Sequence, residues 1–122
     1  MAMKEWLFHR NGQALLFLYD DRFISADGEN LGWLVGNEVF SLKGSHLGWF
    51  ERGVLFDRDN NVLAFTADAT GYLPSRPAIG GVPAAPEIPA APERQSLCGN
   101  LIRQGYGGWS IRTLEQFFLV IL

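Results

Sequence analysis

A period of 16 residues runs through the first half of the chain and limits what the chain can fold into. Glycine, leucine and aromatic residues each return at a fixed position of this period. The rows are Gly12, Gly28, Gly44 and Asn60, then Leu15, Leu31, Leu47 and Leu63, then Phe8, Ile24, Phe40 and Phe56, and then Phe17, Trp33, Trp49 and Phe65. Several rows at one spacing indicate tandem copies of one supersecondary unit. Residues 7–70 are therefore predicted to form four equivalent units.

Each unit carries two turn signals about eight residues apart. The first set is Asn11-Gly12, Asp27-Gly28, Lys43-Gly44 and Asp59-Asn60, and the second is Asp20-Asp21, Gly36-Asn37, Arg52-Gly53 and Asp68-Ala69. The first set suits two-residue hairpin turns whose second residue has positive φ, which glycine adopts without strain and asparagine tolerates. A chain that reverses this often predicts an all-β fold of eight short antiparallel strands in meander order.

The turn type also predicts which side chains share a face of each hairpin. A two-residue turn at Asn11-Gly12 places Phe8 opposite Leu15, so positions 8, 15 and 17 of every unit should lie together and form the core. Burial of these side chains stabilises the fold by roughly 1.5–3 kcal/mol each before conformational entropy is counted. The positions of Leu7 and Leu18 are also apolar in nearly every unit, so both faces should be covered.

The remaining positions of the unit fix the expected arrangement of the hairpins. Beside the leucine row lie mostly small residues, Leu16, Gly32, Gly48 and Ala64, which indicate close approach of a neighbouring backbone. The end of each hairpin near the first turn is polar. We therefore expect four petals around a pseudo-fourfold axis, with polar tips outward and apolar bases at the centre.

This pattern resembles the 4-fold beta-flower family of small bacterial proteins. The resemblance is carried by Asp27-Gly28-Glu29-Asn30-Leu31-Gly32-Trp33 and Lys43-Gly44-Ser45-His46-Leu47-Gly48-Trp49, and by a Pro-rich segment that ends near Gly108-Trp109-Ser110. It covers residues 6 to about 110. The chain departs from the family pattern at Asn60, which stands in place of glycine, and in the apolar tail 111–122. The resemblance implies a fold and no chemistry.

Residues 71–122 differ from the repeats, so we divide the chain into a repeat domain, 1–70, and an arm with a tail, 71–122. Six prolines, Pro74, Pro77, Pro83, Pro86, Pro89 and Pro92, predict an extended polyproline-like arm. We expect the second apolar face of the repeats, in this chain or in a partner, to hold it. Residues 111–122 have helical spacing, with Leu114, Phe117, Phe118 and Ile121 on one side, and residues 117–122 fit a strand equally. The Val120-Ile121 pair favours a strand at the very end. Such an apolar tail also indicates self-association.

Charge and cysteine content exclude several classes of function. The net charge is −3 and no cluster of lysine and arginine occurs, which argues against nucleic acid and against an anionic membrane surface as partners. The C-terminal apolar run is too short to span a bilayer. Cys98 is the single cysteine, so no internal disulfide can form, and the N-terminal residues lack the apolar stretch of a signal peptide. We expect a cytoplasmic protein.

No group of residues predicts a catalytic, metal or cofactor site. His9 and His46 occupy different positions of their units, and Cys98 has no histidine or second cysteine near it in sequence. Asp57-Arg58-Asp59-Asn60-Asn61 looks like the start of a calcium loop with Asp68 at the twelfth position, but Val62 stands where such loops need glycine. The repeat assigns this segment to a hairpin tip instead.

The row of Phe17, Trp33, Trp49 and Phe65 leaves two interpretations open. It is either plain core or an aromatic cage for a cationic or sugar-like ligand. We therefore expect a non-enzymatic structural or protein-interaction module, whose partner is a second copy of itself or another protein. The alternative is a small-ligand binder that uses these four residues. An enzyme would require His9, His46 and Cys98 to lie close together in a cleft.

Overall fold

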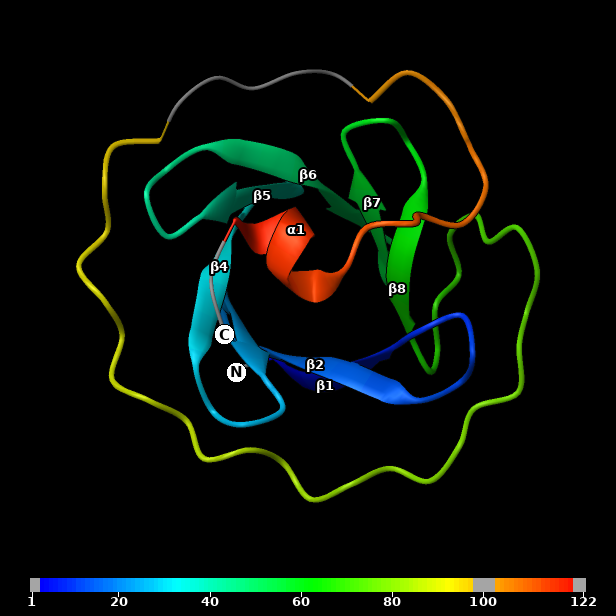
Figure 1. The fold of residues 1–122 in the computed structure, drawn as a ribbon, viewed down its shortest axis with the longest axis horizontal. Coiled ribbons are helices and arrows are strands. Elements are labelled where there is room, and N and C mark those ends of the chain that lie inside the picture. The colour runs from blue at the N-terminus through cyan, green and yellow to red at the C-terminus, as the bar shows by residue number, and fades with distance from the viewer. Residues whose placement is uncertain (1–2, 98–102, 120–122) are drawn as a thin grey trace.

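The computed structural model describes residues 3–97 and 103–119 and shows an all-β fold in which eight antiparallel strands close into a barrel (Figure 1). The strands are β1 (Lys4–Phe8), β2 (Ala14–Tyr19), β3 (Arg22–Ser25), β4 (Asn30–Val35), β5 (Glu38–Ser41), β6 (His46–Glu51), β7 (Val54–Asp57) and β8 (Val62–Thr66). Each strand pairs with the next, and β8 returns to β1 through Leu7 opposite Thr66 and Phe8 opposite Phe65. The prediction of four tandem hairpins in meander order is confirmed, and closure of the barrel leaves no unpaired sheet edge.

The turns between successive hairpins have the predicted two-residue form. Tyr19 pairs with Arg22 across Asp20-Asp21, and Phe17 pairs with Ile24 as the sequence predicts. Asp20 has a φ of 58°, because a two-residue turn that follows the twist of its strands needs positive φ at its central positions. Asp68, the fourth counterpart, follows β8, where the chain leaves the barrel.

The turns at the hairpin tips differ from the prediction, because they are three-residue loops. In the first hairpin the amide of His9 donates to Gln13 O and the amide of Gly12 donates to His9 O, both at 2.8 Å. Gly12 has a φ of 86°, so the predicted positive φ is correct although the loop is one residue longer. The longer loop pairs Phe8 with Ala14 rather than with Leu15.

A β-bulge in every hairpin restores the predicted register below the tip. Leu7 still pairs with Leu16, so Leu15 is an extra residue on its strand. The side chains of Leu15 and Leu16 therefore do not lie on opposite faces of the sheet, as neighbouring residues of a regular strand do. Both leucines pack in the barrel interior, together with the equivalent Leu31, Leu47 and Leu63. The predicted common face of positions 8, 15 and 17 is therefore wrong, since a shift of one residue moves Leu15 to the other face.

The bulge also explains the row of small residues. Two consecutive residues face the interior, and in the second and third hairpins the second of them is glycine. A side chain on Gly32 would lie 2.5 Å from the carbonyl oxygen of Phe40 and 3.0 Å from the ring of Phe118. The predicted close approach of a neighbouring backbone is confirmed here, and an aromatic ring fills the space that the missing side chain leaves.

The outer face of the barrel carries a second apolar cluster that the proline-rich arm covers. Figure 1 shows the described parts of the arm following the outside of the hairpins, and after residue 103 the chain turns in toward the centre. Leu73, Ile88 and Trp109 pack on this cluster. The indole of Trp6 donates to Pro83 O at 3.1 Å, and Arg22 donates to Pro89 O at 2.9 Å. The arm thus rests on aromatic and polar side chains of its own chain.

The arm meets the first three hairpin tips at intervals of nine residues. Gly12 lies under the carbonyl of Ala78, Gly28 under that of Glu87 and Gly44 under that of Ser96. These glycines therefore serve both the turn and the contact with the arm. In the fourth hairpin the roles are exchanged, because Asn60 occupies the tip and Gly107 of the arm approaches it, donating to Asn60 O at 2.8 Å.

A short helix, α1 (Leu114–Phe118), lies over the centre of the barrel and closes one of its ends (Figure 1). Thr113 and Gln116 form a reciprocal capping box that starts the helix. Phe117 and Phe118 join the interior cluster. Of the two alternatives left open for the tail, the helix is found at Phe117 and Phe118 and the strand is wrong there. Residues 120–122, where the Val120-Ile121 pair favoured a strand, lie outside the described part.

No helix among the described residues is long and apolar enough to cross a membrane. Cys98 lies outside the described residues.

Candidate functional site

The four aromatic residues predicted to form a ring are buried but do not meet. Phe17, Trp33, Trp49 and Phe65 lie at equivalent positions of β2, β4, β6 and β8 on the outer face of the barrel, and they are 3–5% exposed. Within the described chain, no ring contact joins any two of them. Each instead packs on residues of its own surroundings, so no shared cage forms around the axis.

The immediate neighbours of these rings come from adjoining strands and from the arm. Phe17 contacts Trp6 with ring centroids 5.2 Å apart, and Phe65 contacts Trp109 at 6.0 Å. The guanidinium of Arg94 lies over Trp33, 4.3 Å from its centroid. The place that a cationic ligand would take on Trp33 is therefore filled by the arm.

The residues considered for metal binding or catalysis serve other contacts. Asp57 accepts the amides of Asp59 and Asn61, at 2.9 and 3.0 Å, in the hairpin tip that the repeat predicts. Its other oxygen accepts hydrogen bonds from Ser110 and Arg112, both at 2.7 Å. In the described chain, no group of three histidine, cysteine or acidic residues could hold a metal ion.

The two histidines lie in different hairpins and different surroundings. His9 is at the first tip, where its Nδ1 accepts the amide of Asn11 at 3.3 Å. His46 begins β6 and is 6% exposed, with ring contacts to Phe40 and Trp49 at 5.4 and 5.1 Å. The structure thus does not bring His9 and His46 together, and Cys98 is not described.

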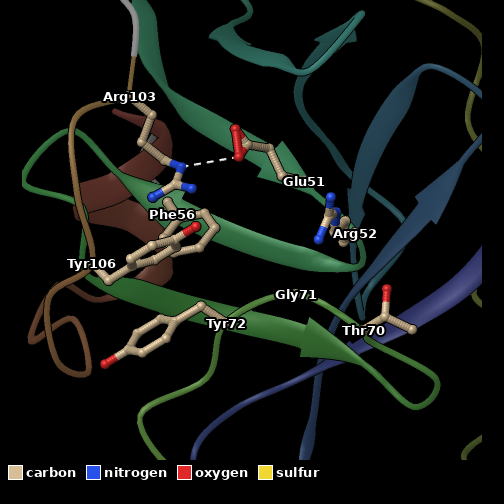
Figure 2. Close-up of a pocket in the computed structure, with 8 residues that line it drawn as sticks. All are labelled: Glu51, Arg52, Phe56, Thr70, Gly71, Tyr72, Arg103 and Tyr106. Carbon is tan, nitrogen blue, oxygen red and sulfur yellow. Dashed lines mark hydrogen bonds and ion pairs between the residues drawn. The ribbon is translucent and has the colours of Figure 1, made fainter.

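A cleft beside the fourth hairpin brings charged and aromatic side chains together, and we call it the Arg103 cleft. It encloses about 210 Å³ and lies where the arm leaves the barrel and later returns. Its walls are formed by Glu51, Arg52, Phe56, Thr70, Gly71, Tyr72, Arg103 and Tyr106. Figure 2 shows Arg103, Phe56 and the two tyrosines gathered at one end and Arg52 and Thr70 at the other.

The charged end of the Arg103 cleft is held rigidly. Nε of Arg103 donates to Glu51 Oε2 at 3.0 Å (Figure 2). Its guanidinium also donates to the carbonyl oxygen of Gly105. The same guanidinium lies 4.2 Å from the ring centroid of Phe56 and 4.4 Å from that of Tyr106. Because the guanidinium of Arg103 is planar and is fixed by two rings and a carboxylate, the N–H groups that these contacts do not use keep a constant orientation.

The tyrosines form the outer wall of the Arg103 cleft. The rings of Tyr72 and Tyr106 are in contact, with centroids 4.6 Å apart and planes inclined by 39°, and the Tyr72 hydroxyl donates to Gly107 O at 2.9 Å. Tyr106 is nevertheless 63% exposed and Tyr72 37% exposed. Two ordered aromatic rings that stay open to solvent are unusual for a chain whose other aromatics are mostly covered.

Arg52 supplies a second cation at the far end of the Arg103 cleft. It occupies a turn with a φ of 50°, and its carbonyl accepts the amides of Thr70 and Gly71 at 2.9 and 3.0 Å. Its side chain is exposed and forms no ion pair with any described residue. The cleft therefore holds two guanidinium groups against the one carboxylate of Glu51.

A second hollow adjoins the Arg103 cleft at the end of the barrel away from α1. It encloses about 440 Å³, and Arg52 and Thr70 line both spaces. Leu34 and Phe50 of the interior cluster form part of its wall, and Glu5 and Asp68 lie at its polar side. The pKa of Glu5 is raised above its ordinary value, first by burial and then by the charge of Asp68.

The sequence does not predict the Arg103 cleft. Tyr72, Arg103 and Tyr106 stand outside the 16-residue repeat, in segments without regular periodicity, and the cleft forms only because the arm leaves and returns at the same hairpin. One signal was available, because Tyr106 lies among glycines, where an aromatic residue has few local side chains to pack on.

Comparison with known proteins agrees with the geometry. No curated protein and no solved structure gives a significant match to the chain. The family described as 4-fold beta flower protein matches residues 5–118, which include the arm, α1 and all of the eight strands except Lys4 of β1. The four hairpins around a common centre are the four petals that this description names, and the chain belongs to the 4-fold beta flower protein family.

Proposed function

We propose that the protein is a non-enzymatic interaction module that binds an extended, acidic segment of another protein in the Arg103 cleft. The observation that carries this proposal is the exposed pair of Tyr72 and Tyr106, whose tilted rings are in contact with centroids 4.6 Å apart beside the fixed guanidinium of Arg103. Tyrosine and arginine are enriched at the centres of protein interfaces, because they combine a large contact area with directed hydrogen bonds.

The size of the cleft supports a segment rather than a broad flat partner. A space of about 210 Å³ accommodates one or two side chains. The charges of Arg52 and Arg103 outweigh that of Glu51, which favours a carboxylate on the partner. Because Arg103 and Tyr72 are already held by Glu51 and Gly107, little side-chain entropy is lost when the partner binds.

The rest of the barrel supports an interaction role at this place. The arm covers much of the outer apolar face, and α1 closes one end of the interior. The tail residues Phe117 and Phe118, whose apolar character was the sequence-based reason to expect self-association, are buried within their own chain. Binding by the exposed tyrosines does not require the barrel to open.

The proposal can be tested by selection from a phage-displayed library of random peptides on the full-length protein. Selected peptides are expected to share an acidic residue near an aromatic residue or proline, and to bind more weakly to the Tyr106→Ala variant. Val82→Ser, which changes a 66% exposed residue of the arm, is the matched control and should leave binding unchanged. A failure to select any peptide that distinguishes wild type from Tyr106→Ala would overturn the proposal.

Light scattering after size exclusion tests the other partner that the sequence left open. A monomer in wild type agrees with a peptide partner. A dimer that the Tyr106→Ala variant converts to a monomer would replace the peptide with a second copy of the chain at the same cleft.

A further inference from the structure

A separate hollow beside α1 is lined by basic and apolar side chains, and we call it the basic hollow. It encloses about 270 Å³ and is formed by Ser45, His46, Leu47, Arg58, Arg112, Gln116, Phe117 and Leu119. None of these described residues is acidic. The hollow lies between the start of β6, the tip of the fourth hairpin and α1, and it shares no residue with the Arg103 cleft.

His46 has unused hydrogen-bonding capacity in the wall of this hollow. Its side chain is 3% exposed, and neither ring nitrogen has a hydrogen-bond partner. Nε2 lies 3.2 Å from Glu38 Oε1, but the two groups are not aligned for a hydrogen bond. A buried imidazole always carries at least one N–H donor, and such donors are rarely left unpaired in native proteins.

Arg58 supplies a positive charge beside the unpaired imidazole of His46. Burial is the main cause that lowers the pKa of His46; the charge of Glu38 opposes it, and the charge of Arg58 lowers the pKa further. At neutral pH the ring is thus a neutral donor beside a guanidinium. Arg58 is exposed and forms no ion pair with any described residue, so its charge is available to a ligand.

The charge balance points to a ligand with one negative charge. Arg112 already binds Asp57 at 2.7 Å and Asp59 at 3.0 Å, so its charge is shared with two carboxylates. Among the described residues that line the hollow, Arg58 is then the one cation without a carboxylate partner. A dianion would be repelled by Asp57 and Asp59, whereas a monoanion matches Arg58.

The apolar half of the hollow indicates that the ligand carries a hydrocarbon portion. Leu47 and Phe117 are nearly buried, but Leu119 at the end of α1 is 65% exposed. Leu119 is held there with a φ of 58°, a left-handed conformation that is strained for leucine. A hydrocarbon chain packed against these three side chains would remove apolar surface from water.

From these contacts we propose that the basic hollow binds a small amphiphilic carboxylate. The carboxylate faces Arg58, His46 and Arg112, and a short alkyl chain lies against Leu47, Phe117 and Leu119. This site is independent of the peptide-binding role proposed for the Arg103 cleft, so either can fail without the other.

The test is calorimetric titration of the full-length protein with sodium hexanoate, with the imidazole signals of His46 followed by NMR. Hexanoate is expected to bind and to raise the pKa of His46, because an anion stabilises the imidazolium form. Hexanol lacks the charge and inorganic phosphate lacks the chain, so both should bind at least about tenfold more weakly. Equal binding of hexanol, or binding of hexanoate without a change at His46, would overturn the proposal.

Matched variants localise the effect. Arg58→Gln should weaken hexanoate binding by about tenfold, which corresponds to one lost charge-assisted hydrogen bond. Arg10 occupies the equivalent position of the first hairpin tip and is also exposed, so Arg10→Gln should bind hexanoate like the wild type. Both changes lie on exposed tips and leave the barrel interior untouched. Equal affinity of Arg58→Gln and Arg10→Gln would show that the carboxylate does not bind at this hollow.

Discussion

The carboxylate of Asp57 accepts a hydrogen bond from the hydroxyl of Ser110 at 2.7 Å, although the two residues lie 53 positions apart. Asp57 is 1% exposed and ends β7, while Ser110 stands where the arm has completed its path and turns toward α1. Arg112 also binds Asp57, and the amide of Ser110 donates to Val62 O at 2.8 Å. This group of contacts fastens the end of the arm to the last hairpin and so positions α1 over the barrel.

Replacement of Asp57 by alanine should therefore destabilise the whole fold. The variant loses hydrogen bonds to Ser110, Arg112 and two amides of its own tip, and we expect a loss of about 3 kcal/mol in the free energy of unfolding, measured in urea. Asp59→Ala is the control, because its bridge to Arg112 is exposed and worth less than about 1 kcal/mol. Equal losses in the two variants would show that Asp57 does not hold the arm.

The glycine at the second tip should be required by the arm as well as by the turn. Gly28 has a φ of 87°, and a side chain there would lie 2.8 Å from the carbonyl oxygen of Glu87. Gly36→Ala is a matched control, because Gly36 also has positive φ but no atom lies within 4 Å of the added carbon. Both variants bear the backbone strain, about 1–2 kcal/mol.

Gly28→Ala should lose more stability than Gly36→Ala and should also release the arm. Limited proteolysis between residues 78 and 96 measures that release. Arm cleavage that is no faster in Gly28→Ala than in Gly36→Ala would contradict a role for this contact.

The periodic part of the fold could be predicted from the sequence because its signals are local. The pairing of Phe17 with Ile24 follows from the two-residue turn at Asp20-Asp21 alone. The pairing of Phe8 with Ala14 does not, because Asn11-Gly12 suits a two-residue or a three-residue loop equally. The three-residue loop, with its bulge at Leu15, places a second leucine in the interior of the closed barrel. That contact is between distant strands, so the turn sequence alone does not reveal it.

The sites depend on contacts between distant segments, which is why the sequence did not reveal them. Pro74, Pro83 and Pro92 of the arm are nine residues apart. This spacing can be interpreted only when the hairpin tips that the arm contacts are known. Arg103 and Tyr106 reach Phe56 across about 50 residues of chain. No local pattern predicts that approach.

Removal of the Phe118 ring should open the end of the barrel that α1 closes. The ring is fully buried, lies 5.6 Å from that of Phe23 and fills the space above Gly32. Phe118→Ala is expected to lower the free energy of unfolding by about 3–5 kcal/mol, because it leaves a cavity in the interior. Leu119→Ala, next in sequence but 65% exposed, should change stability by less than about 0.5 kcal/mol. Comparable losses would mean that α1 is not part of the core.

The carboxyl of Glu5 should make stability depend on pH in a defined direction. Its pKa in the folded protein is raised above the ordinary value of 4.5, chiefly by burial and also by the charge of Asp68. The folded state thus binds this proton more tightly than the unfolded chain, so the favourable contribution is complete below pH 4.5 and is lost as the pH rises through the raised value.

Glu5→Gln, which stays uncharged, should therefore gain stability relative to wild type between about pH 4 and 7. Denaturant unfolding of both proteins across this range measures the difference. Asp68→Asn removes the charge of Asp68 but leaves Glu5 buried. The stability of this variant should therefore keep part of the pH dependence that Glu5 causes. Parallel stability curves for wild type and Glu5→Gln would show that the carboxyl ionises as freely in the barrel as in the unfolded chain.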